Sequence, residues 1–194
     1  TILTPGSKSI IHNVLCNDTR IYFLKILKKM NANVKIKNLR KLSGEVVGTI
    51  EASYTDKLKP IVISKDIGKF IDELPILFVI AALTKGISKF SNIEDLKHKE
   101  SNRLVESKKI LVQAGFKCKV TKGDMIIYGK KKIETKNKSI SVKTKDDHRI
   151  CMSSMILSLV TGINTKIKNF ETVNTSFPGF ISIMKRLGGK VVIK

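Results

Sequence analysis

The sequence predicts an α/β fold made of repeated units whose helices lie buried inside sheets, with the first unit truncated. Apolar residues at i, i+1 and i+4, which line one face of a helix, recur at 26–31, 110–115 and 183–188. Each of these segments reaches Asn or Gly, which favour the end of a helix, and continues into a short strand-like run. Two almost wholly apolar stretches, which open at Asp72 and at Asp147, complete the pattern.

The strands that should follow the three helices are short, and each begins within two residues of the Asn or Gly that ends the helix. They are expected at 33–36, 117–120 and 190–193. Helix, stop and strand therefore recur three times along the chain.

The two apolar stretches predict buried helices. The first contains Pro75, which suits the first turn of a helix, and ends at 84–86; the second ends at Gly162. A helix that is apolar on all sides must be buried on all sides, which here means packing beneath a sheet. A buried strand is the rival interpretation, but a stretch of eleven or more residues favours a helix. Strand-like runs follow at 87–93 and 163–170.

The beginning of the chain repeats only the end of this second pattern. Residues 2–6 lead to a glycine and then to a strand-like run at 10–14, as happens after each apolar helix. We therefore expect one domain of three units, 1–60, 61–135 and 136–194, and the first unit should lack its opening strand and most of its buried helix.

The net charge of +21 favours anionic partners such as phosphorylated metabolites, acidic lipid or nucleic acid. The excess is nearly all lysine, spread along the whole chain, and no aromatic-plus-basic signature of an RNA-recognition module accompanies it. We therefore expect a generally lysine-rich surface and no specific nucleic-acid partner.

The remaining composition argues against secretion, membrane insertion and metal binding. The three cysteines are never closely spaced, and the three histidines lack metal-ligand spacing. No apolar run approaches the roughly 20 residues of a membrane span, and the first residues do not read as a signal peptide. A reducing cytoplasm is the expected location.

Four motifs carry a family resemblance across all 194 residues. They are "IDELP" (71–75), "HKESNRL" (98–104), "DDHRICM" (146–152) and "NTSFPGF" (174–180). In this order and spacing the chain resembles the C-terminal half of the 5-enolpyruvylshikimate-3-phosphate synthases. Lesser landmarks of the bacterial enzymes lie at 11–20 and 54–63.

This resemblance implies an enolpyruvyltransferase of two similar domains, each built from three βαβαββ units with helices inside a shell of sheets. Such an enzyme transfers the enolpyruvyl group of phosphoenolpyruvate to the 5-hydroxyl of shikimate 3-phosphate and releases phosphate, a step of chorismate and aromatic amino acid biosynthesis. The family passes through a tetrahedral adduct and uses no metal or organic cofactor. The implied partner of this chain is the missing N-terminal domain, so the chain alone is expected to be inactive.

The same resemblance assigns roles to five charged residues near predicted helix N-termini, where anions are favoured. Arg103 and Arg149 match the arginines that clamp phosphoenolpyruvate, and forked guanidinium groups suit its carboxylate and phosphate. Glu100 matches the carboxyl group that protonates the methylene carbon. Asp72 matches the aspartate that binds the shikimate hydroxyls and assists deprotonation, and Lys99 matches the lysine beside the same hydroxyl. Structural roles stay open: ion pairing for the arginines, N-capping for Asp72 and a helix-dipole contact for Glu100.

Three further residues should support the site. His148 is expected to support its neighbour Arg149 rather than act as a base, and Asp147 should cap or orient that loop. Thr175 stands where some family members have a lysine that helps to hold phosphoenolpyruvate, so this contact is in doubt.

Three alternatives accompany this interpretation. The run "GSKS" (6–9) imitates the phosphate-binding opening of the family's full chain, but His12-Asn13-Val14 follows where Ser-Asn-Arg would be expected. The repeat also makes Gly6 the counterpart of Gly86 and Gly162, so Lys8 is not taken as a ligand. The sister enzyme that acts on UDP-N-acetylglucosamine shares the fold, but the motif combination speaks against it. The second function class is a basic module that binds anions or nucleic acid without turnover, which strongly salt-dependent DNA binding would favour.

Overall fold

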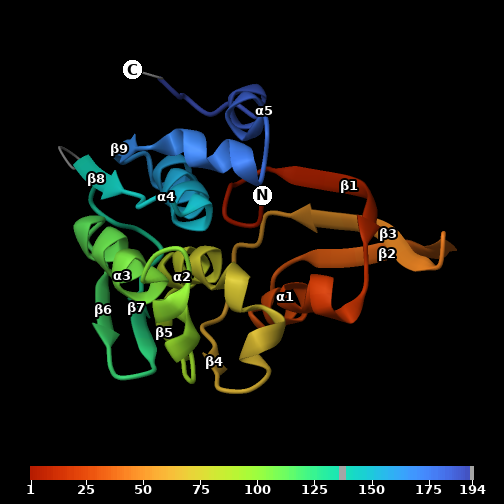
Figure 1. Ribbon diagram of the computed structural model, residues 1–194, viewed down its shortest axis with the longest axis horizontal. Coiled ribbons are helices and arrows are strands. Elements are labelled where there is room, and N and C mark those ends of the chain that lie inside the picture. Colours follow the sequence, from red (N-terminus) through yellow and green to blue (C-terminus); the bar gives the residue numbers. More distant parts are fainter. Residues whose placement is uncertain (136–138, 193–194) are drawn as a thin grey trace.

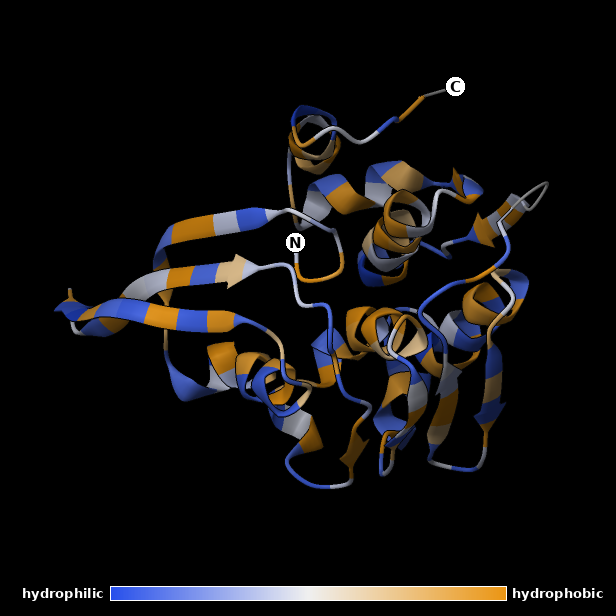
Figure 2. Ribbon diagram, turned by 180° about the vertical axis from the view of Figure 1, so that it is seen from behind, coloured by the Kyte–Doolittle hydropathy of each residue, from blue (hydrophilic) through white to orange (hydrophobic). Residues whose placement is uncertain are grey.

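The computed structural model describes residues 1–135 and 139–192, which form helices and three separate sheets (Figure 1). The first sheet has the strand order β1-β3-β2, with both pairs antiparallel. Its strands and neighbouring helix are β1 (Lys8–Leu15), α1 (Asp18–Lys29), β2 (Val34–Leu42) and β3 (Glu45–Ser53). Hydrophobic and hydrophilic residues alternate along these strands (Figure 2), as expected where one face of a sheet is covered.

The second sheet has the order β4-β5-β7-β6, in which β4 and β5 are parallel and the other pairs are antiparallel. Its strands are β4 (Val62–Ile63), β5 (Gly86–Phe90), β6 (Lys117–Val120) and β7 (Met125–Gly129). The helices of this region are η1 (Ile67–Lys69), η2 (Ile71–Glu73), α2 (Leu74–Ala82), η3 (Glu94–His98) and α3 (Arg103–Gln113).

The third sheet contains only the parallel pair β8 (Ser139–Lys143) and β9 (Asn164–Lys168). Its helices are α4 (His148–Thr161), η4 (Phe170–Thr175) and α5 (Phe180–Arg186). None of the helices in the described parts of the chain has the length and hydropathy needed to cross a membrane.

Helix α2 lies at the centre of the core and contacts α3, α4 and β7. Leu74, Leu77 and Phe78 are fully buried, and Pro75 lies in the first turn. The prediction of a helix buried on all sides is therefore confirmed for this stretch.

The same prediction is only half correct for α4. Its first ten residues include six buried side chains, but residues 158–161 are only half-buried. A two-stranded sheet covers too little of this helix, so its last four residues remain in contact with solvent.

Two other expectations need correction. The repeat predicts residues 2–6 to be the end of the truncated unit's buried helix, but they form turns, with Thr4 N–H donating to Thr1 C=O at 3.0 Å, and they contain no helical turn. The strand expected at 190–193 is absent from its described part, residues 190–192, while Ile193 lies outside the described residues. The corresponding runs are strands in β2 and β6, where β3 and β7 pair with them. The predicted start of the third unit, at 136–138, also lies outside the described residues.

Candidate active site

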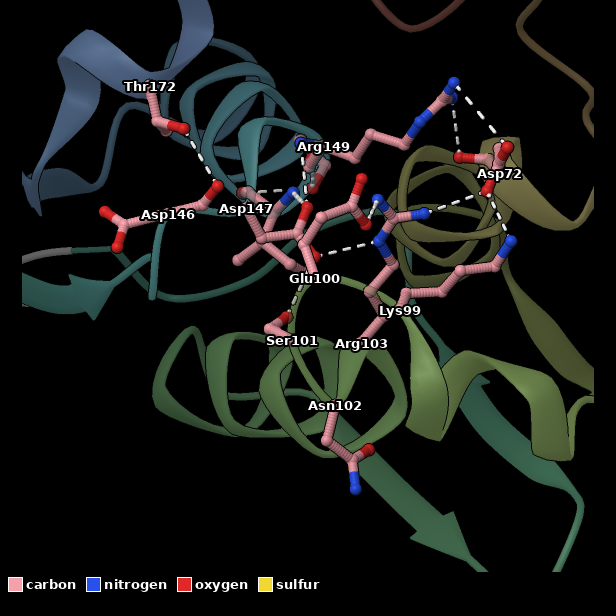
Figure 3. A network of polar contacts seen from close by, with 12 residues as sticks. Asp72, Lys99, Glu100, Ser101, Asn102, Arg103, Asp146, Asp147, Arg149 and Thr172 are labelled. Atoms are coloured by element: carbon pink, nitrogen blue, oxygen red, sulfur yellow. Dashed lines mark hydrogen bonds and ion pairs between the residues drawn. The ribbon is translucent and has the colours of Figure 1, made fainter.

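The N-terminal ends of α2, α3 and α4 converge, and charged side chains from all three meet there (Figure 3). The sequence explains this locally, because each motif places a charged residue just before or within the first turn of a helix. Backbone N–H groups at a helix N-terminus favour anions, so three such ends create a positive local field.

Arg103 forms the floor of this cluster. Its side chain is 1% exposed, although it carries a full charge. Nε donates to Asp147 Oδ2 at 2.8 Å, Nη1 donates to Asp72 Oδ1 at 2.9 Å, and Nη2 donates to Glu100 Oε2. A guanidinium group has five N–H groups, so these three bonds leave one N–H on each Nη atom for another partner.

Asp147 joins α3 to α4. It is fully buried and caps α4, accepting from Arg149 N–H at 3.0 Å and from Ile150 N–H at 3.3 Å through Oδ1. Its other oxygen accepts from Ser101 Oγ at 2.9 Å and from Arg103. The expected capping role is thus present in the geometry, and one carboxylate orients the starts of the two helices that carry both arginines.

Arg149 is held by the segment that precedes α2. Nη1 donates to the backbone carbonyl of Asp72 at 2.8 Å and to Glu73 Oε1 at 3.3 Å, while Nη2 lies 3.9 Å from Asp72 Oδ2. Its side chain is 31% exposed, so of the two arginines it is the one that solvent or a ligand reaches. Glu73 is a site residue that the sequence reasoning missed; its position beside Asp72 in the "IDELP" motif was the available signal.

Asp72 links the cations of the cluster. Lys99 Nζ lies 3.2 Å from Oδ1, the same oxygen that accepts from Arg103. Partial burial works to raise the pKa of Asp72, but the hydrogen bond from Lys99 and the charges of Arg149, Lys99 and Arg103 outweigh it, so this pKa is lowered. In Asp147, burial likewise works to raise the pKa, and the hydrogen bond and charge of Arg103 outweigh it, so its pKa is lowered too.

The cluster has a buried floor and an exposed rim. Arg103 and Asp147 form the floor, whereas the side chains of Asp72 and Glu100 are 42% and 48% exposed. Every cation in the cluster already has a carboxylate partner, so an anionic ligand must use the remaining N–H groups or displace a carboxylate.

The supporting residues lie at different places. His148 is the first residue of α4. Thr175 Oγ1 donates within η4 to Thr172 C=O at 2.7 Å, and Thr172 Oγ1 donates to Asp146 C=O at 2.8 Å. Thr175 therefore contacts the loop before Asp147 indirectly, through Thr172, and its own hydroxyl donates within η4.

Lys8, which the sequence analysis did not take as a ligand, and the polar residue Asn17 both lie outside the cluster. Lys8 begins β1 and lies near Glu51 on the first sheet, and Asn17 donates to Glu45 Oε2 at 2.6 Å beside α1. The sequence analysis also missed Asn102, which caps α3 by accepting from Val105 N–H at 3.1 Å. An Asn directly before an amphipathic helix is the signal that could have identified this cap.

The lowered pKa values of Asp72 and Asp147 predict a loss of stability in acid. A carboxyl group whose folded-state pKa lies below its ordinary value, 3.8 here, stabilises the fold above that pH, and this contribution is lost as the pH falls through the folded-state pKa. We expect the free energy of unfolding, measured by urea denaturation, to decline below about pH 4. Asp147→Asn should reduce that decline, and an unchanged pH dependence in this variant would contradict the assignment.

Comparison with known proteins identifies the family of this chain. A model of the family described as EPSP synthase (3-phosphoshikimate 1-carboxyvinyltransferase) matches residues 1–184. The 3-phosphoshikimate 1-carboxyvinyltransferase of Staphylococcus haemolyticus is 39% identical over 93% of this chain, and that of Campylobacter concisus is 36% identical over 98%. These matches cover 41% and 42% of the two relatives, so the chain spans less than half of their length.

Solved structures show the same likeness. A structure of EPSP synthase from Acinetobacter baumannii matches with a TM-score of 0.89 and 30% identity, over 100% of this chain and 44% of that one. The enolpyruvyl transferase NikO from Streptomyces tendae matches with a TM-score of 0.67 and 15% identity, over 97% of this chain and 40% of that one, which shows a shared fold alone. On the family match and the sequence identities together, this chain belongs to the EPSP synthase family.

Proposed function

We propose that this chain is the C-terminal portion of an enzyme that transfers the enolpyruvyl group of phosphoenolpyruvate to the 5-hydroxyl of shikimate 3-phosphate and releases phosphate. The observation that carries the proposal is the convergence of Arg103, Arg149 and Lys99 with Asp72 and Glu100 at three helix N-termini. Family membership supplies the reaction, since the relatives are named for it.

Arg149 and Arg103 hold phosphoenolpyruvate in this proposal. Arg149 presents a partly exposed guanidinium group to the ligand. The Arg103 side chain is 1% exposed, so it donates to the ligand only when the part-exposed carboxylate of Asp72 or Glu100 is displaced from its Nη atoms. An arriving carboxylate or phosphate competes with Glu73 for Arg149, and loss of this weak 3.3 Å contact costs little.

Glu100 supplies the proton in this proposal. Its acid form gives a proton to the methylene carbon, C3, while the shikimate 3-phosphate oxygen forms a bond to C2 and loses its own proton. The adduct then collapses: the bond from C2 to the phosphate oxygen breaks, phosphate leaves with the proton that the hydroxyl lost and that Asp72 passed on, and a proton from the new methyl group returns to Glu100. One enol ether and one phosphate result, so the protons balance.

Asp72 and Lys99 position the attacking hydroxyl. Because the pKa of Asp72 is lowered, this carboxylate is a weak base and stays ionised. It therefore accepts a hydrogen bond from the hydroxyl and takes part in proton removal only as the C–O bond forms. Lys99, 3.2 Å from Asp72, lies where it can stabilise the developing negative charge on that oxygen.

The remaining portion of the full-length enzyme is the partner that this function requires, and the cytoplasm is the compartment proposed for it. The chain should be mixed with that portion, expressed separately, and phosphate release from phosphoenolpyruvate should be measured with and without shikimate 3-phosphate. Release that requires both portions and both substrates supports the proposal. Strong, salt-sensitive binding to arbitrary DNA without any transfer would favour the non-enzymatic module instead.

Glu100→Gln tests the proposed acid. We expect phosphate release by the mixed portions to fall by about 100- to 10,000-fold, the usual range for loss of a general acid. Glu94→Gln is the matched control, because Glu94 is likewise an exposed glutamate and lies outside the cluster, in η3, just before Glu100 along the chain. Equal rates in Glu100→Gln and the parent chain would remove Glu100 from the mechanism.

A further inference from the structure

The connection between β8 and α4, residues 144–147, determines where the helix that carries Arg149 begins. Lys145 and Asp146 both have a left-handed backbone conformation, with φ of 50° and 61°, which residues other than glycine adopt at a cost. Asp147 follows directly and is fully buried. A costly conformation persists only where surrounding contacts hold it, so the contacts of this connection show what fixes the start of α4.

The segment that follows β9 holds one side of the connection. Thr144 Oγ1 donates to Lys168 C=O at 3.0 Å, and Thr172 Oγ1 donates to Asp146 C=O at 2.8 Å (Figure 3). Asn169 Nδ2 also donates to Asp146 Oδ1, at 3.3 Å. These three hydrogen bonds fix the residues on either side of position 145 but do not reach its side chain.

Helix α3 holds the other side, through three side chains that contact segment 141–147. They are Arg103, which donates to Asp147, Glu106, which pairs with Lys145, and Gln113, which accepts from Ser141 N–H. Helix positions that are three or seven residues apart lie on the same face, so one face of α3 fixes this segment along the length of the helix.

Glu106 is the middle contact and has no role in the reaction described above. Its side chain is only 9% exposed, and its Oε1 lies 3.0 Å from Lys109 Nζ and 3.1 Å from Lys145 Nζ. A carboxylate buried to this extent needs a cation beside it. Lys109 belongs to α3 itself, so its contact fixes nothing outside that helix. Lys145 belongs to the connection, so its contact joins the connection to α3.

We propose that Glu106 is a positioning residue for the anion clamp, the pair Arg103 and Arg149. By pairing with Lys145 it holds the left-handed backbone of the connection, so that Asp147 stays where it contacts both arginines. The catalytic consequence of this role rests on the proposed function, whereas the ion pair and its effect on Asp147 do not.

Asp147 passes any displacement of the connection on to both arginines. Its Oδ2 accepts from Arg103 Nε at 2.8 Å, and its Oδ1 accepts from Arg149 N–H at 3.0 Å. A misplacement of about 1 Å in an active site can cost about 100-fold in rate. A smaller effect is expected on losing the pair with Lys145, because the hydrogen bonds to the segment after β9 remain.

Lys145→Met, which removes the ammonium group and keeps an unbranched side chain, tests the role in the reconstituted enzyme. We expect the KM for phosphoenolpyruvate to rise about 10-fold and the KM for shikimate 3-phosphate to stay unchanged. A variant that merely folds less well would instead lower the amount of active enzyme, and with it the apparent kcat, without changing either KM.

Lys109→Met is the matched control, because Lys109 contacts the same Glu106 oxygen and is similarly exposed, 55% against 57% for Lys145. It should leave both KM values unchanged. An equal rise in KM in the two lysine variants would overturn the inference, since Glu106 would then need only a nearby cation. Glu106→Gln should behave like Lys145→Met, and the double variant should be no worse than either, because both changes remove one contact. Additive effects would also overturn the inference.

Hydrogen exchange measured by NMR on the chain alone tests the positioning without relying on transfer. Arg149 N–H and Ile150 N–H donate to Asp147 Oδ1, so they should exchange about 10-fold faster in Lys145→Met than in the parent chain and at the parent rate in Lys109→Met. Unchanged exchange in Lys145→Met would overturn the inference and leave the proposed function intact. Faster exchange, in a protein whose parent mixture shows no transfer, would support the positioning of Asp147 by Glu106 and overturn the proposed function instead.

Discussion

Arg149→Ala is expected to lower the rate of enolpyruvyl transfer by the reconstituted enzyme by about 100- to 1,000-fold, as loss of a transition-state cation does. Arg149 is the more exposed arginine of the cluster, and its Nη2 is 3.9 Å from the nearest carboxylate oxygen of Asp72, so it is the group most available to an incoming anion. The rate should be measured as phosphate release at saturating shikimate 3-phosphate, over a range of phosphoenolpyruvate concentrations.

Two controls separate binding from folding in this experiment. Arg186→Ala removes an exposed arginine of α5 and should leave the rate unchanged. Arg149→Lys keeps the charge but loses the fork, so it should recover only part of the rate. If Arg149→Ala turned over at the parent rate, the proposed anion clamp would be wrong.

Arg103→Ala is expected to destabilise the fold by about 3–5 kcal/mol, because it leaves the fully buried Asp147 carboxylate without its cation. Arg149→Ala should cost much less, since its partners are part-exposed. Urea denaturation of the chain gives both values. The double variant Arg103→Ala with Asp147→Ala should be less destabilised than the sum of the single variants, because removing both partners removes the unpaired charge. Strict additivity would show that the two side chains do not depend on each other.

The sequence predicted the positions of the candidate site better than its contacts. Asp72, Arg103 and Arg149 stand at helix starts that local signals reveal, such as Pro75 after Asp72. That Arg103 donates to carboxylates from three segments could not be predicted, because the partners lie as far as 44 residues away along the chain. The contact of Arg149 with Glu73 was missed for the same reason.

The wrong predictions about the fold have a different cause. Local pattern correctly predicts α2 and β6, whose partners are within the chain. It fails for residues 190–192, where an apolar run was taken to imply a strand, and for residues 158–161 of α4, where it was taken to imply full burial. A strand at 190–192 and full burial of the end of α4 would each require a neighbouring strand. Sequence periodicity shows that a segment prefers to be buried, but it does not show which segment would bury it.

The central claim is that this chain supplies the acid and the anion clamp of an addition–elimination reaction. The most direct test is to run the reconstituted reaction in deuterium oxide and to analyse the enolpyruvyl ether of shikimate 3-phosphate by mass spectrometry. Because C3 becomes a methyl group before a proton is lost, the ether should carry solvent deuterium on its methylene carbon, and only when both portions are present. An ether without deuterium, or phosphate released without any ether, would contradict the claim.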